Sequence, residues 1–163
     1  MATLTLFCGL PGSGKTTLAK RLETAGSGVR VCTDDVQAEL GVSQQDSEFH
    51  GRLQVVLYRF ALELLDHHVD VILEDGLWTR SERDEKFADA RQRGARVVLH
   101  VFDVPQEVLW ARLQDRHAQP LAGSYVMTEA ELDRAWRIFE PPTDSEFAEI
   151  DETHFHRHSS LKD

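Results

Sequence analysis

Short runs of apolar residues alternate along the chain with longer segments in which apolar residues recur at helical spacing. The short runs predict buried strands at residues 3–8, 29–32, 69–73 and 96–102, and an edge strand at 147–150. Strands that alternate with helices are typical of βαβ units around a parallel sheet. The pattern therefore predicts an α/β fold, a three-layer α/β/α sandwich with a mostly parallel, five-stranded sheet.

The segments between the strands carry signals for helix starts and ends. They predict helices at about residues 15–23, 52–66, 80–93, 105–116 and 129–139. Thr79 with Glu82, and Thr128 with Glu131, have the spacing of a capping box, in which each side chain accepts a hydrogen bond from the other residue's backbone N–H. These boxes fix where two of the helices begin.

The chain has 163 residues, which suits one compact domain, 1–163. No apolar run approaches the roughly 18–20 residues that span a bilayer, so we expect no membrane association. Cys8 and Cys32 lie in apolar runs and are expected to be buried, reduced thiols. Reduced thiols favour a cytoplasmic location.

The net charge of −10 comes from 18 basic and 28 acidic residues. Proteins that grip a long polyanion neutralise its phosphates with clustered Lys and Arg, and this sequence contains no basic run. A small molecule is therefore favoured as the partner over a long nucleic acid.

Residues 9–16, GLPGSGKT, match the P-loop pattern G-x-x-x-x-G-K-[ST]. Glycines let backbone N–H groups turn inward around phosphates, and the helix that follows adds the positive end of its dipole. Lys15 would neutralise the β- and γ-phosphate oxygens, and the Thr16 hydroxyl would ligate Mg²⁺. The residues expected to bind the nucleotide are Gly9, Pro11, Gly12, Ser13, Gly14, Lys15, Thr16 and Thr17.

The alternative for this motif is a glycine loop that only turns a strand into a helix. Because it lies between a predicted strand and a predicted helix, as phosphate binding requires, we interpret the fold as that of a P-loop NTPase that binds ATP and Mg²⁺. The chain lacks the Asn-Lys-x-Asp motif of guanine recognition. It is also too short for the extra helical domain of an oligomeric motor, which leaves a small kinase or a nucleotide hydrolase.

Phosphoryl transfer to a hydroxyl needs a base and a carboxylate that supports the metal. Asp34 follows the second predicted strand, at the edge where α/β sheets bind ligands, and is our candidate for the base. The alternative is that Thr33 or Asp34 only caps the next helix. Residues 71–76, VILEDG, resemble a Walker B strand, in which Glu74 or Asp75 would support Mg²⁺; we assign Glu74.

Arg112 and Arg116 are four residues apart on a predicted helix and therefore share a face. They begin a segment, about 112–128, that we expect to form a short helical lid whose arginines stabilise charge in the transition state. The alternative is a solvated helix face that pairs with nearby carboxylates.

Four further residues are candidates for contacts with the acceptor: Asp35, Trp78, Arg80 and Arg83. Trp78 and Tyr125 lie on predicted loops, where an aromatic ring can stack on an acceptor or on adenine. The two arginines could instead only decorate the start of a helix. The tail, about 152–163, contains three alternating histidines but no convincing set of metal ligands, and we expect it to be a polar, frayed terminus.

Four segments together resemble small bacterial P-loop kinases of the type labelled AAA family ATPases: GLPGSGKT at 9–16, TDD at 33–35, GLWTRSERD at 76–84 and FEPPT at 139–143. These proteins are similar to polynucleotide 5′-kinases and chloramphenicol phosphotransferase. The resemblance extends to about residue 150. It implies that Lys15 and Thr16 serve the phosphates and Mg²⁺, that Asp34 is the catalytic aspartate and that Arg112 or Arg116 is the lid arginine.

One position departs from this pattern. Polynucleotide kinases tend to carry an arginine three residues after the aspartate, and here Gln37 stands in that place. We therefore expect an ATP- and Mg²⁺-dependent phosphotransferase with a small hydroxylated acceptor. The alternatives are a polynucleotide 5′-hydroxyl kinase and a nucleotide-binding regulatory ATPase without an acceptor.

Overall fold

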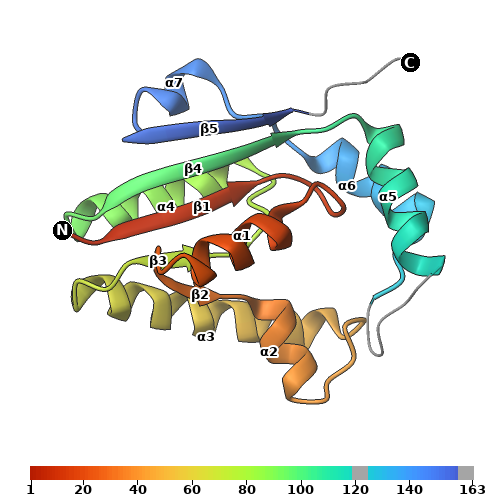
Figure 1. Ribbon diagram of the computed structural model, residues 1–163, viewed down its shortest axis with the longest axis horizontal. Helices are drawn as coiled ribbons and strands as arrows, with labels where there is room; N and C mark the ends of the chain where they lie inside the picture. Colours follow the sequence, from red (N-terminus) through yellow and green to blue (C-terminus); the bar gives the residue numbers. More distant parts are fainter. Residues whose placement is uncertain (119–124, 158–163) are drawn as a thin grey trace.

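The computed structural model describes residues 1–118 and 125–157, which contain a five-stranded sheet in the order β2-β3-β1-β4-β5. The strands are β1 (Thr3–Cys8), β2 (Val29–Val31), β3 (Val71–Leu73), β4 (Arg96–Asp103) and β5 (Glu152–Arg157). Each strand pairs with its neighbours in parallel. Their carboxyl ends therefore share one edge of the sheet, which lies toward α5 in Figure 1.

Helices cover both faces of the sheet. They are α1 (Lys15–Thr24), α2 (Thr33–Glu39), α3 (Ser47–Asp66), α4 (Arg80–Gln92), α5 (Gln106–Ala118), α6 (Glu129–Ile138) and α7 (Asp144–Phe147). The resulting three-layer α/β/α sandwich is the P-loop NTPase fold predicted from the sequence, with a sheet that is parallel throughout the described strands.

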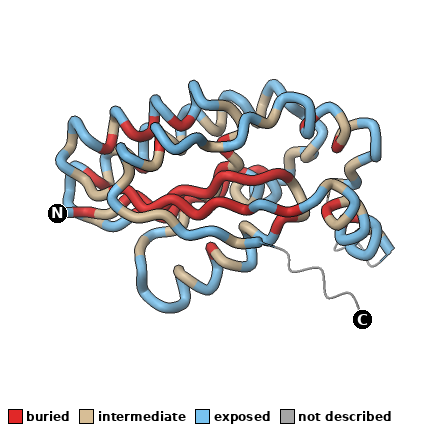
Figure 2. The backbone as a smooth tube through the Cα atoms, turned by 90° about the horizontal axis from the view of Figure 1, so that it is seen from above, coloured by how far each residue is buried: buried red, intermediate tan, exposed pale blue. Residues whose placement is uncertain are grey.

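Two clusters of buried side chains lie on opposite faces of the sheet. Leu4 and Leu6 of β1 pack in one cluster with α3 and α4, whereas Phe7 packs in the other with α1, α5 and α6. Because both faces of β1 are covered, its sequence reads as a continuous apolar run rather than as an alternation. Figure 2 shows the buried residues concentrated in the central strands, with the surrounding helices exposed on their outer sides.

The capping boxes at Thr79–Glu82 and Thr128–Glu131 are both present, as predicted, at the starts of α4 and α6. The predicted start of α3 was five residues too late. Asp46 caps this helix by accepting a hydrogen bond from the backbone N–H of Phe49. The residue that precedes α2 is Cys32, so Thr33 and Asp34 lie in the first turn rather than at the cap.

The predicted edge strand at 147–150 is wrong. A third capping box, formed by Thr143 and Glu146, opens the short helix α7, which ends at Phe147 and is followed by a turn at 148–149. The last strand, β5, comes later, in part of the tail that we expected to be frayed, and pairs with β4 from Val98 to Asp103. It is an edge strand whose residues are all polar apart from Phe155, so its sequence lacks the apolar run that marks a buried strand. Residues 158–163 of the tail lie outside the described residues.

The described cysteines are as predicted: Cys8 and Cys32 are buried and form no disulfide. Burial raises the pKa of the Cys8 thiol to about 11 and that of Cys32 to about 12, so both are protonated near neutral pH. Among the described helices, none is long and apolar enough to cross a membrane.

The histidines of β5 pack against a buried histidine of β4. The Nδ1 atom of His100 lies 2.9 Å from Nε2 of His156, and its ring stacks on that of His154 with the ring centroids 4.7 Å apart. Burial lowers the pKa of His100 to about 4, and the charges of His154 and His156 act in the same direction. His100 is therefore neutral in the folded protein.

This burial predicts that the protein loses stability in mild acid. The unfolded chain takes up a proton on His100 near its ordinary pKa of 6.5, whereas the folded chain does so only near 4. Stability from this group is therefore present above about pH 6.5 and falls as the pH drops toward 4, by about 2 kcal/mol between pH 7.5 and 5. Urea titrations at the two pH values measure it.

The matched variant is His100→Phe, which keeps an aromatic ring and removes the titrating group. The difference between the two pH values should shrink by about 2 kcal/mol in this variant. An unchanged difference would show that other groups cause the acid sensitivity.

Candidate active site

The loop at residues 9–16 joins β1 to α1 and has the backbone conformation that its glycines permit. Gly12 and Gly14 have φ values of 82° and 104°, in the left-handed region. Gly14 directly precedes α1, so the loop leads into the helix N-terminus. This geometry is that of an anion-binding site made of backbone N–H groups.

Lys15 bends back over the loop. Its ammonium group donates hydrogen bonds to the carbonyl oxygens of Gly9 at 2.9 Å and Leu10 at 2.8 Å. Burial lowers the pKa of Lys15 to about 8, against the opposing effect of the charges of Glu74 and Asp34. The side chain is thus held against the loop by two backbone carbonyl groups.

Thr16 and Glu74 lie together, as the metal assignment requires. The Thr16 hydroxyl donates a hydrogen bond to Glu74 Oε1, which joins the start of α1 to the residue after β3. A hydroxyl and a carboxylate supply the oxygen ligands that Mg²⁺ prefers, so these two side chains fit a metal bound beside the loop. Asp75 is buried instead, and burial raises the pKa of its carboxyl, with a hydrogen bond to Gln54 and the charge of Lys86 opposing this.

Arg30 of β2 links Glu74, the candidate metal ligand, to the segment that carries Asp34, the candidate base. Its Nε donates to Glu74 Oε2 at 2.5 Å, and its Nη1 donates to Asp35 Oδ2 at 2.7 Å. The Arg30 and Glu74 side chains are 8% and 5% exposed, so solvent screens this ion pair little. Asp35, predicted to contact the acceptor, is half-exposed and serves here as a partner of Arg30.

Asp34 lies in the first turn of α2 and is well exposed, with 72% of its side chain accessible. Its Oδ1 lies 3.6 Å from Nδ1 of His50 at the start of α3. Gln37, one turn further along α2, is fully buried, and its Oε1 lies 2.9 Å from the same His50 nitrogen. The carboxylate of the candidate base is therefore accessible to solvent and lies beside the His50 ring.

Arg112 of α5 contacts the loop directly. Its Nη1 lies 3.3 Å from the carbonyl oxygen of Gly12 and 3.4 Å from that of Ser13. Arg116, one turn further, is near enough for its charge to depress the pKa of Lys15. The structure therefore brings both predicted arginines to the loop, whereas residues 119–124 of the predicted lid lie outside the described residues.

The three remaining candidates for acceptor contacts differ in position. Arg83 is fully buried, donates to Glu146 Oε1 at 2.7 Å and bonds the backbone of Leu77, so it does not fit the predicted acceptor role. Its ion pair instead fixes α7 against α4. Arg80 is exposed and pairs with Asp84 on the surface of α4. Trp78 is only partly buried and packs against the cluster on the α1 face.

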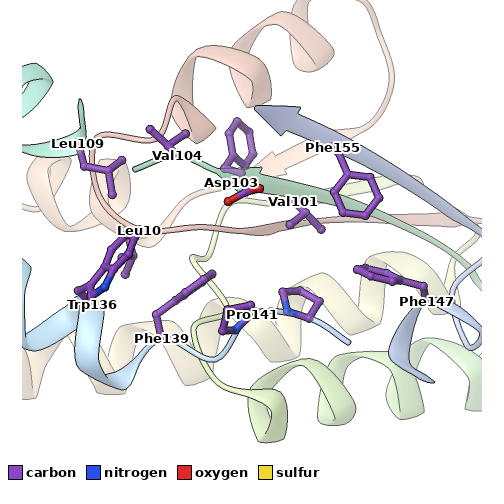
Figure 3. A pocket seen from close by; sticks show the side chains of 12 residues that line it. Leu10, Val101, Asp103, Val104, Leu109, Trp136, Phe139, Pro141, Phe147 and Phe155 are labelled. Atoms are coloured by element: carbon purple, nitrogen blue, oxygen red, sulfur yellow. The ribbon is translucent and has the colours of Figure 1, made fainter. Parts of the chain in front are cut away.

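A cavity of about 350 Å³ lies beside the loop, and neither Lys15 nor Asp34 lines it. Figure 3 shows Trp136 and Phe139 on one side of it and Phe155 of β5 on the other. Leu10 is the loop residue that reaches its wall. The cavity is lined largely by apolar side chains, and none of the polar candidates for catalysis lies in its wall.

Sequence reasoning missed Arg30, His50 and their contacts. Arg30 was visible as a charge within an apolar strand, where a buried partner is required. His50 gave no signal, because its partners come from a helix 13 residues away in the chain.

A family model described as AAA domain matches residues 4–142. The structure is similar to a candidate kinase from Chloroflexus aurantiacus j-10-fl, with a TM-score of 0.71 and 18% identity over 96% of this chain and 85% of that one. A gluconokinase from Sinorhizobium meliloti 1021 matches with a TM-score of 0.59 and 17% identity over 96% of this chain and 82% of the other.

A chain of the Pnkp1/Rnl/Hen1 RNA repair complex is also similar. It matches with a TM-score of 0.68 and 25% identity over 84% of this chain, but only 43% of its own length is covered. The fold is thus shared by a candidate kinase, a gluconokinase and a chain of an RNA repair complex.

The packing of α5 on the loop leads to a stability prediction. A Cβ atom on Gly12 would lie 3.1 Å from the carbonyl oxygen of Leu109 and 3.2 Å from Cγ of Leu113. Gly26 has a similar φ of 75°, but a Cβ there would meet nothing within 4 Å. Both Gly→Ala variants should suffer backbone strain, and only Gly12→Ala should also suffer overpacking.

We expect Gly12→Ala to lose about 1–3 kcal/mol more free energy of unfolding than Gly26→Ala. Urea denaturation followed by circular dichroism measures both. Equal losses of unfolding free energy in the two variants would mean that α5 does not pack closely against the loop at Gly12.

Proposed function

This chain belongs to the AAA domain family, and we propose that it is a kinase that transfers the γ-phosphoryl group of ATP to a hydroxyl of a small molecule. The observation that carries the proposal is the position of Lys15, Glu74 and Asp34 at one sheet edge, with Arg30 linking the segments of the latter two. A phosphate loop alone fits any nucleotide-binding protein. A metal-supporting carboxylate and an exposed aspartate beside that loop fit group transfer.

The geometry supports a role for each of these residues. The loop N–H groups and Lys15 bind the β- and γ-phosphates, and Thr16 and Glu74 would hold Mg²⁺, which neutralises charge on the phosphate oxygens when bound. Asp34 accepts the proton of the acceptor hydroxyl as its oxygen attacks the γ-phosphorus. The bond from that phosphorus to the β–γ bridging oxygen breaks, ADP leaves, and Asp34 later returns the proton to solvent. Arg116, with Arg112 braced on the loop, stabilises the charge on the transferring group.

The charges around Asp34 support an acceptor without phosphate groups. Phosphate recognition uses arginines and lysines whose donors are available. Arg30 is held by Glu74 and Asp35, and Lys86 pairs with Glu85 and lies 3.6 Å from the centroid of the Tyr58 ring. The remaining terminal nitrogen of Arg30, Nη2, has no partner among the described residues but is buried and not open to a ligand. Both cations are thus engaged within the protein, which agrees with the acidic net charge of −10.

A polynucleotide 5′-hydroxyl kinase is the second candidate, and the similarity to the RNA repair chain favours it. On α2, Gln37 stands where polynucleotide kinases tend to carry an arginine. That glutamine is fully buried and bonds its own chain, so it does not reach a phosphate.

The test is phosphate transfer from γ-labelled ATP to a panel of acceptors: gluconate, ribose, nucleosides, an aminoglycoside and an oligonucleotide with a 5′-hydroxyl. We expect transfer to a small member of the panel. Lys15→Ala should lower it by at least about 100-fold, since a charge aimed at the phosphates is lost. Asp34→Asn should lower kcat by about 10²–10⁴-fold, since the base is lost.

Lys20→Ala, on the exposed side of α1, is the control and should leave transfer unchanged. Full transfer by Asp34→Asn would remove Asp34 as the base. Labelling of the oligonucleotide alone, with a steep loss of activity as salt rises, would establish the polynucleotide kinase instead. ATP binding without transfer to any member would contradict both.

A further inference from the structure

His50 is a polar group of the site to which no role has been assigned. It lies at the end of the first turn of α3, facing α2, and its side chain is one-third exposed. Two oxygen atoms approach its Nδ1: the carboxamide Oε1 of Gln37 at 2.9 Å and the carboxylate Oδ1 of Asp34 at 3.6 Å. The Gln37 oxygen is within hydrogen-bond distance and a carboxamide oxygen only accepts, so Nδ1 of His50 is placed as the donor.

The orientation of the Gln37 amide supports the same conclusion. Its Nε2 lies 2.7 Å from the carbonyl oxygen of Ser43 and 3.5 Å from that of Asp46. Turning the amide over would set its oxygen against these two carbonyls and leave a buried group unsatisfied, which costs about 1–3 kcal/mol. The Gln37 oxygen therefore faces His50 and fixes a proton on Nδ1.

Hydrogen bonding at one ring nitrogen decides the state of the other. With its proton on Nδ1, the neutral ring of His50 carries a lone pair on Nε2, which has no hydrogen-bond partner in the described part of the chain. The same ring lies beside Asp34, whose Oδ1 is 3.6 Å from Nδ1. Nε2 is thus a hydrogen-bond acceptor close to the base.

We propose that His50 binds the acceptor: Gln37 holds it in the Nδ1–H tautomer, and its Nε2 accepts a hydrogen bond from a second hydroxyl of the molecule that Asp34 deprotonates. The acceptor is then an uncharged polyol, such as a sugar or a nucleoside, rather than a mono-alcohol or a phosphate ester. Gln37 is a positioning residue that acts through His50. The inference rests on the proposed kinase function for the identity of the ligand, but not for the state of the ring.

The state of the ring can be measured without any substrate. Long-range ¹H–¹⁵N correlation spectra of the ¹⁵N-labelled protein at pH 8 distinguish a protonated from an unprotonated ring nitrogen. The His50 signal is the one that His50→Asn removes. We expect Nδ1 to be protonated and Nε2 unprotonated. A proton on Nε2 overturns the proposal, whether or not a kinase activity is found.

Two substitutions separate the two ring nitrogens in kinetics. His50→Asn keeps a donor near the Nδ1 position, and so the bond to Gln37, but removes the acceptor at Nε2. His50→Gln places an amide oxygen near Nε2 and should restore part of the activity. For the best acceptor of the panel, His50→Asn should lower kcat/KM by about tenfold, the worth of one hydrogen bond, with the KM for ATP unchanged.

The second hydroxyl is tested with analogues of that acceptor that each lack one hydroxyl. The wild type should lose about tenfold in kcat/KM for one of them, and His50→Asn should treat that analogue and the parent alike. His67→Asn, the same change at the exposed end of α3, is the control. Equal discrimination by His50→Asn and the wild type overturns the proposal. Failure of the whole panel contradicts the kinase function and leaves the spectrum to decide the tautomer by itself.

Discussion

The parallel pairing of β1 with β3 and β4 is the constraint on which the site depends. It sets Leu6 beside Leu73 and Cys8 beside Val101, so the segments that leave these strands begin at the same edge. The hydrogen bond from the Gly9 N–H to the Gly76 carbonyl, 3.0 Å long, continues this pairing beyond the strands. Because helices cover both faces of the sheet, the edge is where polar backbone and side chains of several segments can meet a ligand.

Buried charges then hold these segments in place. Arg30 joins the residue after β3 to the first turn of α2, and Arg83 joins α4 to Glu146 of α7. Burying such ions is costly unless each is paired and hydrogen-bonded. Any shift of these segments that separated the partners would leave a buried charge unpaired, so the pairs favour the observed arrangement. At the candidate active site this fixes Glu74 relative to the helix turn that carries Asp34. Apolar contacts alone would let the distance between Glu74 and Asp34 vary. Group transfer depends on a fixed distance between such groups.

Local signals made much of the fold predictable. The bounds of β1, the loop at residues 9–16 and two capping boxes depend on residues close in sequence. Errors arose where a residue's role depends on distant partners. The local sequence around Arg83 predicts an exposed helix residue. The side chain is buried because it pairs with Glu146, 63 positions later in the chain. The sequence analysis missed β5 because this polar strand forms only by pairing with β4. It missed His50 because the contacts of this side chain are with Gln37 and Asp34 on another helix.

The central claim is that this edge passes a phosphoryl group to a hydroxyl, and ³¹P NMR tests it even when the acceptor is unidentified. The purified chain is incubated with ATP, Mg²⁺ and an extract of small metabolites. We predict a new phosphomonoester resonance that grows as the γ-phosphate signal of ATP declines, and its absence with Lys15→Ala. Release of inorganic phosphate alone, or the same spectrum from the Lys15→Ala variant, would contradict the account.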